Sequence, residues 1–186
     1  CDLTVEEERK KLIEKISNID GCVNNAGIVK TIPTNFITEE KYKEVMDINT
    51  KSPILLTQQL IKTKKITKGA SIVFTSSISG NYCGIKGNVL YSVSKSAIEG
   101  FVKNAALDLA IKNIRVNSVT PGMIDTGILK DGAIHEEQIK EDLKRYPLRR
   151  YGKAIEVAFA IIYLLSDASQ WVTGSSLLID GGYTLR

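Results

Sequence analysis

The sequence has few of the residues that cross-link a protein or bind a metal ion. Its 186 residues include three cysteines, Cys1, Cys22 and Cys83, and a single histidine, His135. The odd number of cysteines, without any CxxC pair, argues against a disulfide framework, and no cysteine stands at metal-ligand spacing from the histidine. We therefore expect no metal site and a reducing, cytoplasmic environment.

Long apolar runs and a strong charge of one sign are also missing. No stretch reaches the roughly 18 to 20 apolar residues that a membrane-spanning helix needs, and the charged start of the chain has no apolar signal core. The net charge of +4 is small and spread along the sequence, which argues against nucleic acid or an anionic membrane as a partner. A chain of this length buries roughly 70% of its unfolded surface, so a core without cross-links is sufficient.

Segments with helical periodicity alternate with short apolar runs. Helices are predicted at residues 4–17, 38–49, 53–61, 91–111, 135–145 and 154–165, and strands at residues 20–27, 70–75, 113–119 and 175–179. Thr4 and Glu7 have the spacing of a capping box at the start of the first helix. The alternation indicates βαβ units and therefore an α/β fold of the Rossmann type, with a doubly wound parallel sheet, helices on both faces and a single domain over residues 1–186.

Polar or glycine-containing loops follow three of the predicted strands. They are NNAG at residues 24–27, SSISG at residues 76–80 and TPGMIDT at residues 120–126. Ligands of open parallel sheets bind beyond the carboxyl ends of the strands. We therefore expect these three loops to meet at one edge of the sheet and to form the functional site.

Tyr91 and Lys95 lie four residues apart on a predicted helix, so both side chains share one face. A nearby ammonium lowers the pKa of a tyrosine from about 10 toward neutrality and makes the phenol a usable general acid or base. Tyr82 and Lys86 have the same spacing in a glycine-flanked loop, where the helical argument fails. Accidental spacing is the alternative interpretation of such a pair.

Two further polar residues join this pair as candidates. Ser77 ends a strand, where its hydroxyl can donate to a substrate oxygen that gains or loses charge, and Ser76 and Ser79 compete for the same role. Asn49 stands at the end of a helical stretch. The plainer interpretations are an ordinary strand-end serine and an asparagine that caps or bends the backbone.

The ordered series of motifs closely resembles the short-chain dehydrogenase/reductase family. The series consists of NNAG, Asn49, Ser77, YSVSK with Tyr91 and Lys95, Pro121 and Gly122 with Thr126, and a terminal IDGG. These motifs are individually common and jointly specific. The resemblance extends from residue 1 to the end of the chain, and segments such as IRVNSVTPGMIDT are most similar to the 3-oxoacyl-carrier-protein reductase type.

The resemblance implies a role for each candidate. Tyr91 would donate and accept the proton, and Lys95 would lower the pKa of Tyr91 and hold the ribose hydroxyls of the nicotinamide. Ser77 would orient the substrate carbonyl, and Asn49 would anchor a water chain that relays protons to Lys95. The residues implied to contact the cofactor, NAD or NADP, are Asp2 and Leu3 beside the adenine, Asn25, Ala26 and Gly27 on the adenosine side, Pro121, Gly122, Ile124 and Thr126 at the nicotinamide, and Tyr91 and Lys95.

The implied activity is hydride transfer between NAD(P) and a carbonyl or secondary alcohol, with a 3-oxoacyl thioester as one candidate substrate. The alternative is a catalytically silent nucleotide-binding or scaffold protein on the same fold. The resemblance also implies a homotetramer or homodimer, in which the helix at 91–111 and the helix that starts at Pro53 pack against symmetry mates. The small residues that would permit this close approach are Ser96, Ala97, Gly100, Ala105 and Ala106.

One departure from the family pattern concerns the glycine-rich turn that meets the cofactor pyrophosphate, because the sequence contains no such turn. In a sheet of strand order 3-2-1-4-5-6-7, the chain would begin near strand 3, without strands 1 and 2. We therefore expect it to lack roughly 55 to 65 N-terminal residues of a domain of about 250 residues. The residue that separates NAD from NADP would be lost with them.

Residues 123–152 are charged and lack continuous apolar periodicity. They contain Gly127, Gly132 and Gly152 as candidate hinges and adjoin the implied nicotinamide contacts. We expect a lid that closes over the substrate, with a passive surface loop as the alternative.

Overall fold

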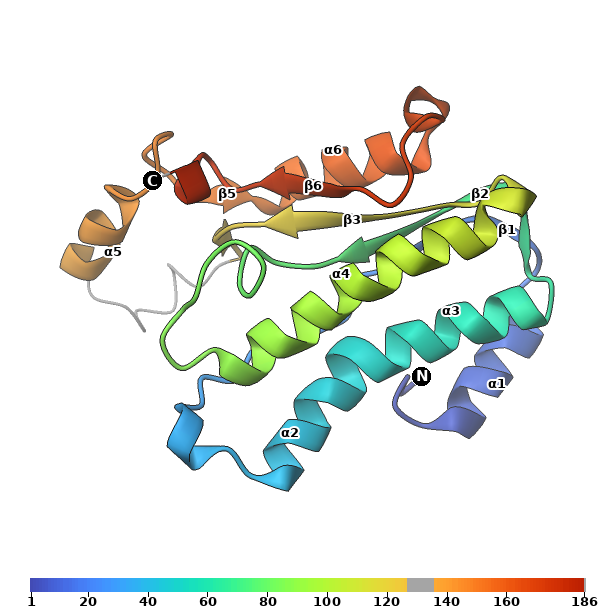
Figure 1. Cartoon of the computed structure of the whole chain (residues 1–186), viewed down its shortest axis with the longest axis horizontal. Helices are drawn as coiled ribbons and strands as arrows, with labels where there is room; N and C mark the ends of the chain where they lie inside the picture. The colour runs from blue at the N-terminus through green and yellow to red at the C-terminus, as the bar shows by residue number, and fades with distance from the viewer. Residues whose placement is uncertain (127–135, 186) are drawn as a thin grey trace.

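A four-stranded parallel sheet forms the middle layer of the protein. The computed structural model describes residues 1–126 and 136–185. The sheet contains β1 (Ile19–Asn24), β2 (Ile66–Thr75), β3 (Arg115–Pro121) and β6 (Ser176–Ile179), hydrogen-bonded in that order with every neighbouring pair parallel. The carboxyl ends of all four strands therefore lie at one edge of the sheet (Figure 1).

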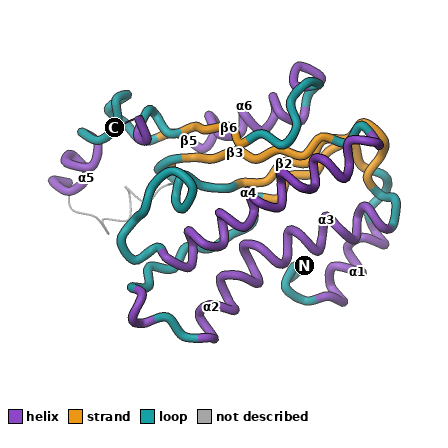
Figure 2. The backbone as a smooth tube through the Cα atoms, viewed as in Figure 1, coloured by secondary structure: helices purple, strands orange, loops and turns teal. Residues whose placement is uncertain are grey.

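Helices cover both faces of this sheet. α1 (Glu6–Lys15), α3 (Ser52–Lys62) and α4 (Val89–Leu109) lie on one side, and α6 (Ala154–Leu165) lies on the other (Figures 1 and 2). The predicted doubly wound α/β architecture is confirmed.

Alternate side chains of β2 contribute to two hydrophobic clusters, one on each face of the sheet. Ile72 and Phe74 belong to the cluster beneath α3 and α4, whereas Val73 belongs to the cluster beneath α6. Phe74 also packs edge-on against Phe101 of α4, with the ring centroids 5.5 Å apart. Because successive side chains of a strand point to opposite faces, a strand covered on both sides needs the continuous apolar run that this segment has.

The first helix begins differently from the prediction. α1 starts at Glu6 with Val5 as its flanking residue and has no side-chain cap, so the expected capping box is wrong. The hydroxyl and backbone N–H of Thr4 instead donate to the Asp2 carboxylate, at 2.7 and 2.8 Å. Residues 1–5 form a turn that precedes α1, and the first strand starts at Ile19.

The predicted helices at 38–49 and 53–61 form one continuous helical stretch. α2 (Glu39–Met46) runs into a π-turn at Asp47–Lys51 and then into α3 without leaving the helical region of the backbone. Thr38 caps the start of α2 by accepting a hydrogen bond from the Lys41 N–H. π-turns inside α-helices are frequent at functional sites, and this one contains Asn49.

The segment expected to form a lid is tied down at both of its described ends. β4 (Ile124–Asp125) pairs with β5 (Gly152–Lys153), and the Gly152 N–H donates to the Met123 carbonyl at 3.0 Å. Gly152 is therefore hydrogen-bonded within a pair of strands, so the expectation that it acts as a hinge is not supported. α5 (Glu136–Leu143) lies between these strands in sequence, and Gly127 and Gly132 lie outside the described residues.

Three further features concern the part of the chain that the structure describes. None of its helices combines the length and the apolar character needed to cross a lipid bilayer. No group of three or more histidine, cysteine, aspartate or glutamate side chains within it is arranged to hold a metal ion. Cys1, Cys22 and Cys83 all carry free thiols.

The loop that follows β2 folds back against the first turns of α4. The Ser79 and Ser92 hydroxyls are hydrogen-bonded at 2.7 Å, and the Gly80 N–H donates to the Cys83 carbonyl at 2.9 Å. Gly80 has a φ of +107°, and a Cβ atom at this position would lie 2.7 Å from the Ser92 carbonyl oxygen. Glycine is therefore required here both by the backbone conformation and by the close approach to α4.

We predict that Gly80→Ala lowers the free energy of unfolding by about 2 kcal/mol or more, because the added methyl group is strained and collides with α4. Gly84→Ala in the same loop is the matched control, since a Cβ there meets nothing within 4 Å. Urea denaturation of both variants measures the difference. Equal stability of the two variants would contradict the close packing of this loop.

Candidate functional site

Asn49 ties the loop after β1 to helix α4. Its side chain is buried, with 1% of its surface exposed. The Asn49 Oδ1 accepts from the Ile28 N–H at 2.8 Å, and Nδ2 donates to the Ile28 carbonyl at 2.9 Å and to the Ser94 Oγ at 3.0 Å. The amide is therefore held rigidly, and it fixes the position of the NNAG loop relative to α4.

Gly27 brings this loop against Lys95. A Cβ atom on Gly27 would lie 3.3 Å from the Asn49 Oδ1 and 3.4 Å from the Lys95 Nζ. The first of these contacts is tighter than ordinary van der Waals contact, so a larger residue would press on the Asn49 amide. Three of the residues singled out from the sequence thus meet at one point.

The structure distinguishes between the three candidate serines. The Ser76 hydroxyl donates to the Lys95 carbonyl at 3.3 Å, and the Ser79 hydroxyl is bonded to Ser92. Ser77 is the one that is hydrogen-bonded to the side chain of Tyr91. The Ser77 Oγ also accepts from the Ser79 N–H at 3.1 Å, which orients the hydroxyl.

The two tyrosine–lysine pairs differ in their backbone. Tyr91 and Lys95 stand one turn apart on α4, and the Lys95 Nζ lies 5.7 Å from the centre of the Tyr91 ring. Tyr82 and Lys86 lie in turns of the loop that precedes α4, and Tyr82 is 44% exposed. Only the first pair therefore has the shared helical face that the chemistry requires.

Burial controls the electrostatics of the pair. Lys95 is 4% exposed, its ammonium donates to the Thr75 carbonyl at 2.7 Å, and burial lowers its pKa to about 8. Burial also raises the pKa of Tyr91 above its usual value of 10, and the hydrogen bond with Ser77 opposes that shift. The expectation that Lys95 brings the pKa of Tyr91 toward neutrality is therefore wrong for the protein by itself, because loss of solvent is the largest influence on this pKa.

The residues implied to lie beside the adenosine line one cavity. Asp2, Leu3, Asn25 and Ala26 are among the walls of a space of about 300 Å³ at the end of β1. The Asn25 Oδ1 accepts a hydrogen bond from the Thr75 hydroxyl at 2.8 Å, which connects this cavity to the strand end that holds Lys95. The structure thus brings the turn at residues 2–3 next to residues 25–26, which lie more than 20 positions further along the sequence.

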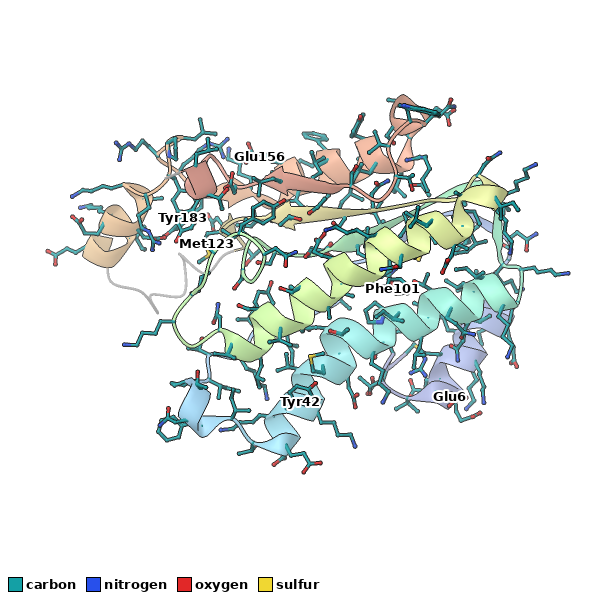
Figure 3. All side chains as sticks on the ribbon, viewed as in Figure 1. Glu6, Tyr42, Phe101, Met123, Glu156 and Tyr183 are labelled. Carbon is teal, nitrogen blue, oxygen red and sulfur yellow. The ribbon has the colours of Figure 1, made fainter. Side chains whose placement is uncertain are left out.

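The residues implied to lie at the nicotinamide follow β3. The Pro121 carbonyl accepts from the Ile78 N–H at 3.1 Å, and the Gly122 N–H donates to the Ile179 carbonyl at 2.9 Å. The side chain of Ile124 packs into the core beneath α6, and Thr126 is exposed. Figure 3 shows Met123 near Tyr183, at the end of the sheet where β3 and β6 stop.

Two residues that the sequence analysis did not single out complete the site. Ser94 receives the Asn49 amide, and its own hydroxyl donates to the Tyr91 carbonyl at 2.7 Å. Glu99 is 3% exposed, and its carboxylate accepts from the Ser118 hydroxyl at 2.9 Å and from the Thr120 hydroxyl at 3.4 Å. The available signal was their position on the Lys95 face of the helix, but a sequence does not show which polar side chains become buried.

The polar atoms of the site fit the implied dinucleotide in part. An ammonium has three N–H donors, and within the described residues the Thr75 carbonyl is the one hydrogen-bond acceptor of Lys95. Its remaining donors suit vicinal hydroxyls such as those of a ribose. The chain has no glycine-rich turn, so a pyrophosphate contact of that kind is not provided by these residues.

Comparison with known proteins agrees with these observations. The family profile described as Enoyl-(Acyl carrier protein) reductase matches residues 1–184. The 3-oxoacyl-[acyl-carrier-protein] reductase FabG of Thermotoga maritima is 38% identical over 181 residues, which are 97% of this chain and 72% of that protein. Cyclopentanol dehydrogenase of Comamonas sp. (strain NCIMB 9872) is 36% identical over 173 residues, which are 93% of this chain and 69% of that protein.

Two solved structures share the fold of this chain. A short chain dehydrogenase family protein from Francisella tularensis subsp. tularensis SCHU S4 superimposes with a TM-score of 0.90 and 35% identity, over all of this chain and 80% of that one. The angucycline C-6 ketoreductase LanV, solved with bound NADP, has a TM-score of 0.89 over all of this chain and 74% of that one. At 24% identity, the second likeness concerns the fold alone.

The lowered pKa of Lys95 predicts how stability depends on pH. Between about pH 8 and 10.5 the unfolded chain holds a proton on Lys95 that the folded protein has released, so stability rises with pH in this window. Relative to Lys95→Met, the wild-type protein should gain about 2 kcal/mol of unfolding free energy from pH 7 to pH 10.

Denaturation by urea across this pH range measures the gain, with Lys86→Met as the control because Lys86 is exposed. Parallel pH curves for wild type and Lys95→Met would show that Lys95 is not desolvated in the folded protein.

Proposed function

This chain belongs to the short-chain dehydrogenase/reductase family, and we propose that Asn49, Ser77, Tyr91 and Lys95 form its reaction centre. The protein is an NAD(P)-dependent oxidoreductase that transfers a hydride between the nicotinamide and a carbonyl or secondary alcohol. The observation that carries the assignment of the centre is the Ser77–Tyr91 hydrogen bond beside the buried ammonium of Lys95.

Tyr91 and Ser77 act on the substrate oxygen. In the reducing direction the Tyr91 phenol gives its proton to the oxygen of the carbonyl, and in the oxidising direction it takes the proton back. The Ser77 hydroxyl donates a hydrogen bond to the same oxygen and stabilises the negative charge that develops there. The cofactor, when bound, supplies or accepts the hydride.

Lys95 and Asn49 support this proton transfer. The ammonium of Lys95 holds the ribose hydroxyls with the donors that Thr75 leaves available, and its charge stabilises the phenolate that Tyr91 becomes. Both amide protons of Asn49 are already donated, to Ile28 and Ser94, so a relaying water molecule would donate to the remaining lone pair of Oδ1. The low pKa of Lys95, about 8, allows it to pass a proton near neutral pH.

The cofactor contacts follow the strand ends. The adenosine of NAD or NADP lies in the cavity at the end of β1, and the nicotinamide lies beside the segment that follows β3. The proposed contacts are Asp2, Leu3, Asn25, Ala26 and Gly27 on the first side, Pro121, Gly122, Ile124 and Thr126 on the second, and Tyr91 and Lys95 between them.

The similarity to a 3-oxoacyl-[acyl-carrier-protein] reductase and to a cyclopentanol dehydrogenase supports two substrate classes. A 3-oxoacyl thioester is the proposed first candidate, and a cyclic secondary alcohol is the second to be assayed. The three free thiols support a cytoplasmic location, where they stay reduced.

We also infer a dimer or tetramer built through α4, on a face that differs in part from the expected one. Ala105 and Ala106 are buried in the protein's own core, so they are not available to a symmetry mate. Val93, Leu107 and Ile111 are instead 45%, 77% and 88% exposed along one side of α4 and the turn after it. Exposed apolar side chains at this helical spacing are typical of an interface between helices.

Tyr91→Phe should lower kcat by about 100- to 10,000-fold and leave cofactor affinity nearly unchanged, because it removes only the transferable proton. Steady-state kinetics and fluorescence titration with NADH and NADPH measure the two effects in the full-length protein. Tyr82→Phe is the control and should keep its activity. Equal losses in both variants would overturn the assignment of Tyr91, and wild-type cofactor binding without turnover would favour the silent alternative.

Replacing Leu107 and Ile111 together by glutamate should reduce the molar mass of the assembly, since it places charges on the proposed interface. Light scattering at micromolar concentration measures the mass, and circular dichroism checks that the fold is kept. Phe36→Glu is the control, because Phe36 is also exposed but lies near α2, away from the end of α4 that carries Leu107 (Figure 1). A monomeric wild-type protein would contradict the inferred interface.

A further inference from the structure

Arg9 is a buried charged side chain outside the reaction centre. It lies on α1 and is 3% exposed, although this helix is otherwise charged and mostly exposed. The Arg9 Nη1 donates to the carbonyl oxygen of Leu3 at 2.6 Å. A hydrogen bond from a charged donor to a backbone carbonyl is among the stronger ones in proteins, so this contact holds Leu3 firmly.

The turn that Arg9 holds is tied to α1 at two places. Besides the Arg9–Leu3 contact, the Asp2 N–H donates to the Glu8 carboxylate at 2.7 Å. The Asp2 carboxylate closes the turn on itself by accepting from Thr4. The backbone of residues 2–4 is thus placed by side chains of the following helix.

This turn is one wall of the cavity proposed for the adenosine. Asp2, Leu3 and Thr4 line one side of it, and Asn25 and Ala26 line another. Arg9 itself does not line the cavity. Its effect on that space is therefore transmitted through the Leu3 backbone.

The burial of Arg9 carries a cost in stability. Among the described residues, the Arg9 Nε and the Gln59 Oε1 are the two buried side-chain atoms without a hydrogen-bond partner, and both residues line a groove of about 450 Å³ between α1 and α3. A buried guanidinium with an unused donor is unfavourable. A methionine of similar length would fill the same space without that penalty.

We propose that Arg9 is a positioning residue for the cofactor, which holds the Leu3 carbonyl so that the turn at residues 2–4 keeps the shape of the adenosine cavity. This inference rests on the proposed function, because it assumes that the adenosine lies against Asp2 and Leu3. The residue touches neither the cofactor nor the substrate.

The test uses Arg9→Met in the full-length protein. The Kd and KM for NADH or NADPH, whichever the wild type prefers, should rise about tenfold, because the variant loses the charged hydrogen bond to Leu3 and the turn relaxes only in part. The kcat at saturating cofactor should stay unchanged, and the Tm should stay equal or rise. Arg9→Lys keeps a cationic donor and should restore most of the affinity.

Two control variants separate positioning from general effects on the groove. Gln59→Leu removes the other unpartnered atom of the groove and should leave the cofactor KM unchanged, as should Lys10→Met, which removes an exposed charge on the same helix. An unchanged KM in Arg9→Met would overturn the proposal, and so would a fall in Tm or a failure of that variant to fold, since Arg9 would then be structural. A wild-type protein that binds neither NADH nor NADPH would instead contradict the proposed function itself.

Discussion

The contact between the Lys95 ammonium and the Thr75 carbonyl constrains the rest of the candidate site. A cation that is 4% exposed has lost most of its water, so polar atoms of the protein must replace that water. Thr75 does so from the end of β2, and a Cβ atom on Gly27 would lie 3.3 Å from the Asn49 Oδ1 and 3.4 Å from the Lys95 Nζ, so both side chains lie close to this glycine. A strand end, a π-turn and the loop after β1 therefore converge on one nitrogen atom.

Polar contacts fix the first half of the buried side of helix α4. The Asn49 amide and the Thr50 hydroxyl bind Ser94, and the Glu99 carboxylate, one turn beyond Lys95, accepts from the Ser118 hydroxyl of β3. These contacts cost more to break than apolar packing, because each would leave a buried polar group without a partner. The orientation of Tyr91 toward the strand ends follows from this bracing, which the reaction needs because general acid catalysis depends on geometry.

Most of the site could be predicted from the sequence because its residues stand at strand ends and at helical spacing, both of which are local properties. Position at a strand end did not by itself distinguish Ser77 from Ser76 and Ser79, because all three lie in the same loop. The family resemblance implied Ser77, and the path of the loop in the structure brings that serine to Tyr91. The pKa of Tyr91 was predicted with the wrong sign because spacing shows the neighbouring charge but not the loss of solvent, which is the larger effect here. The burial of Arg9 could not be recognised from the sequence, because Arg9 is one of many charged residues in α1.

The sequence by itself determined the order of strands and helices, the parallel sheet with covered faces, and the edge at which the NNAG, SSISG and TPGMIDT loops meet, because periodicity and turn residues depend on near neighbours in the chain. Only the tertiary structure decided which polar groups are buried: Lys95 against Thr75, Arg9 against Leu3, and Ala105 in the core instead of at an interface. Burial and hydrogen bonding between distant segments depend on how the elements pack in three dimensions, and the free energy of a charge or a methyl group depends on what then surrounds it.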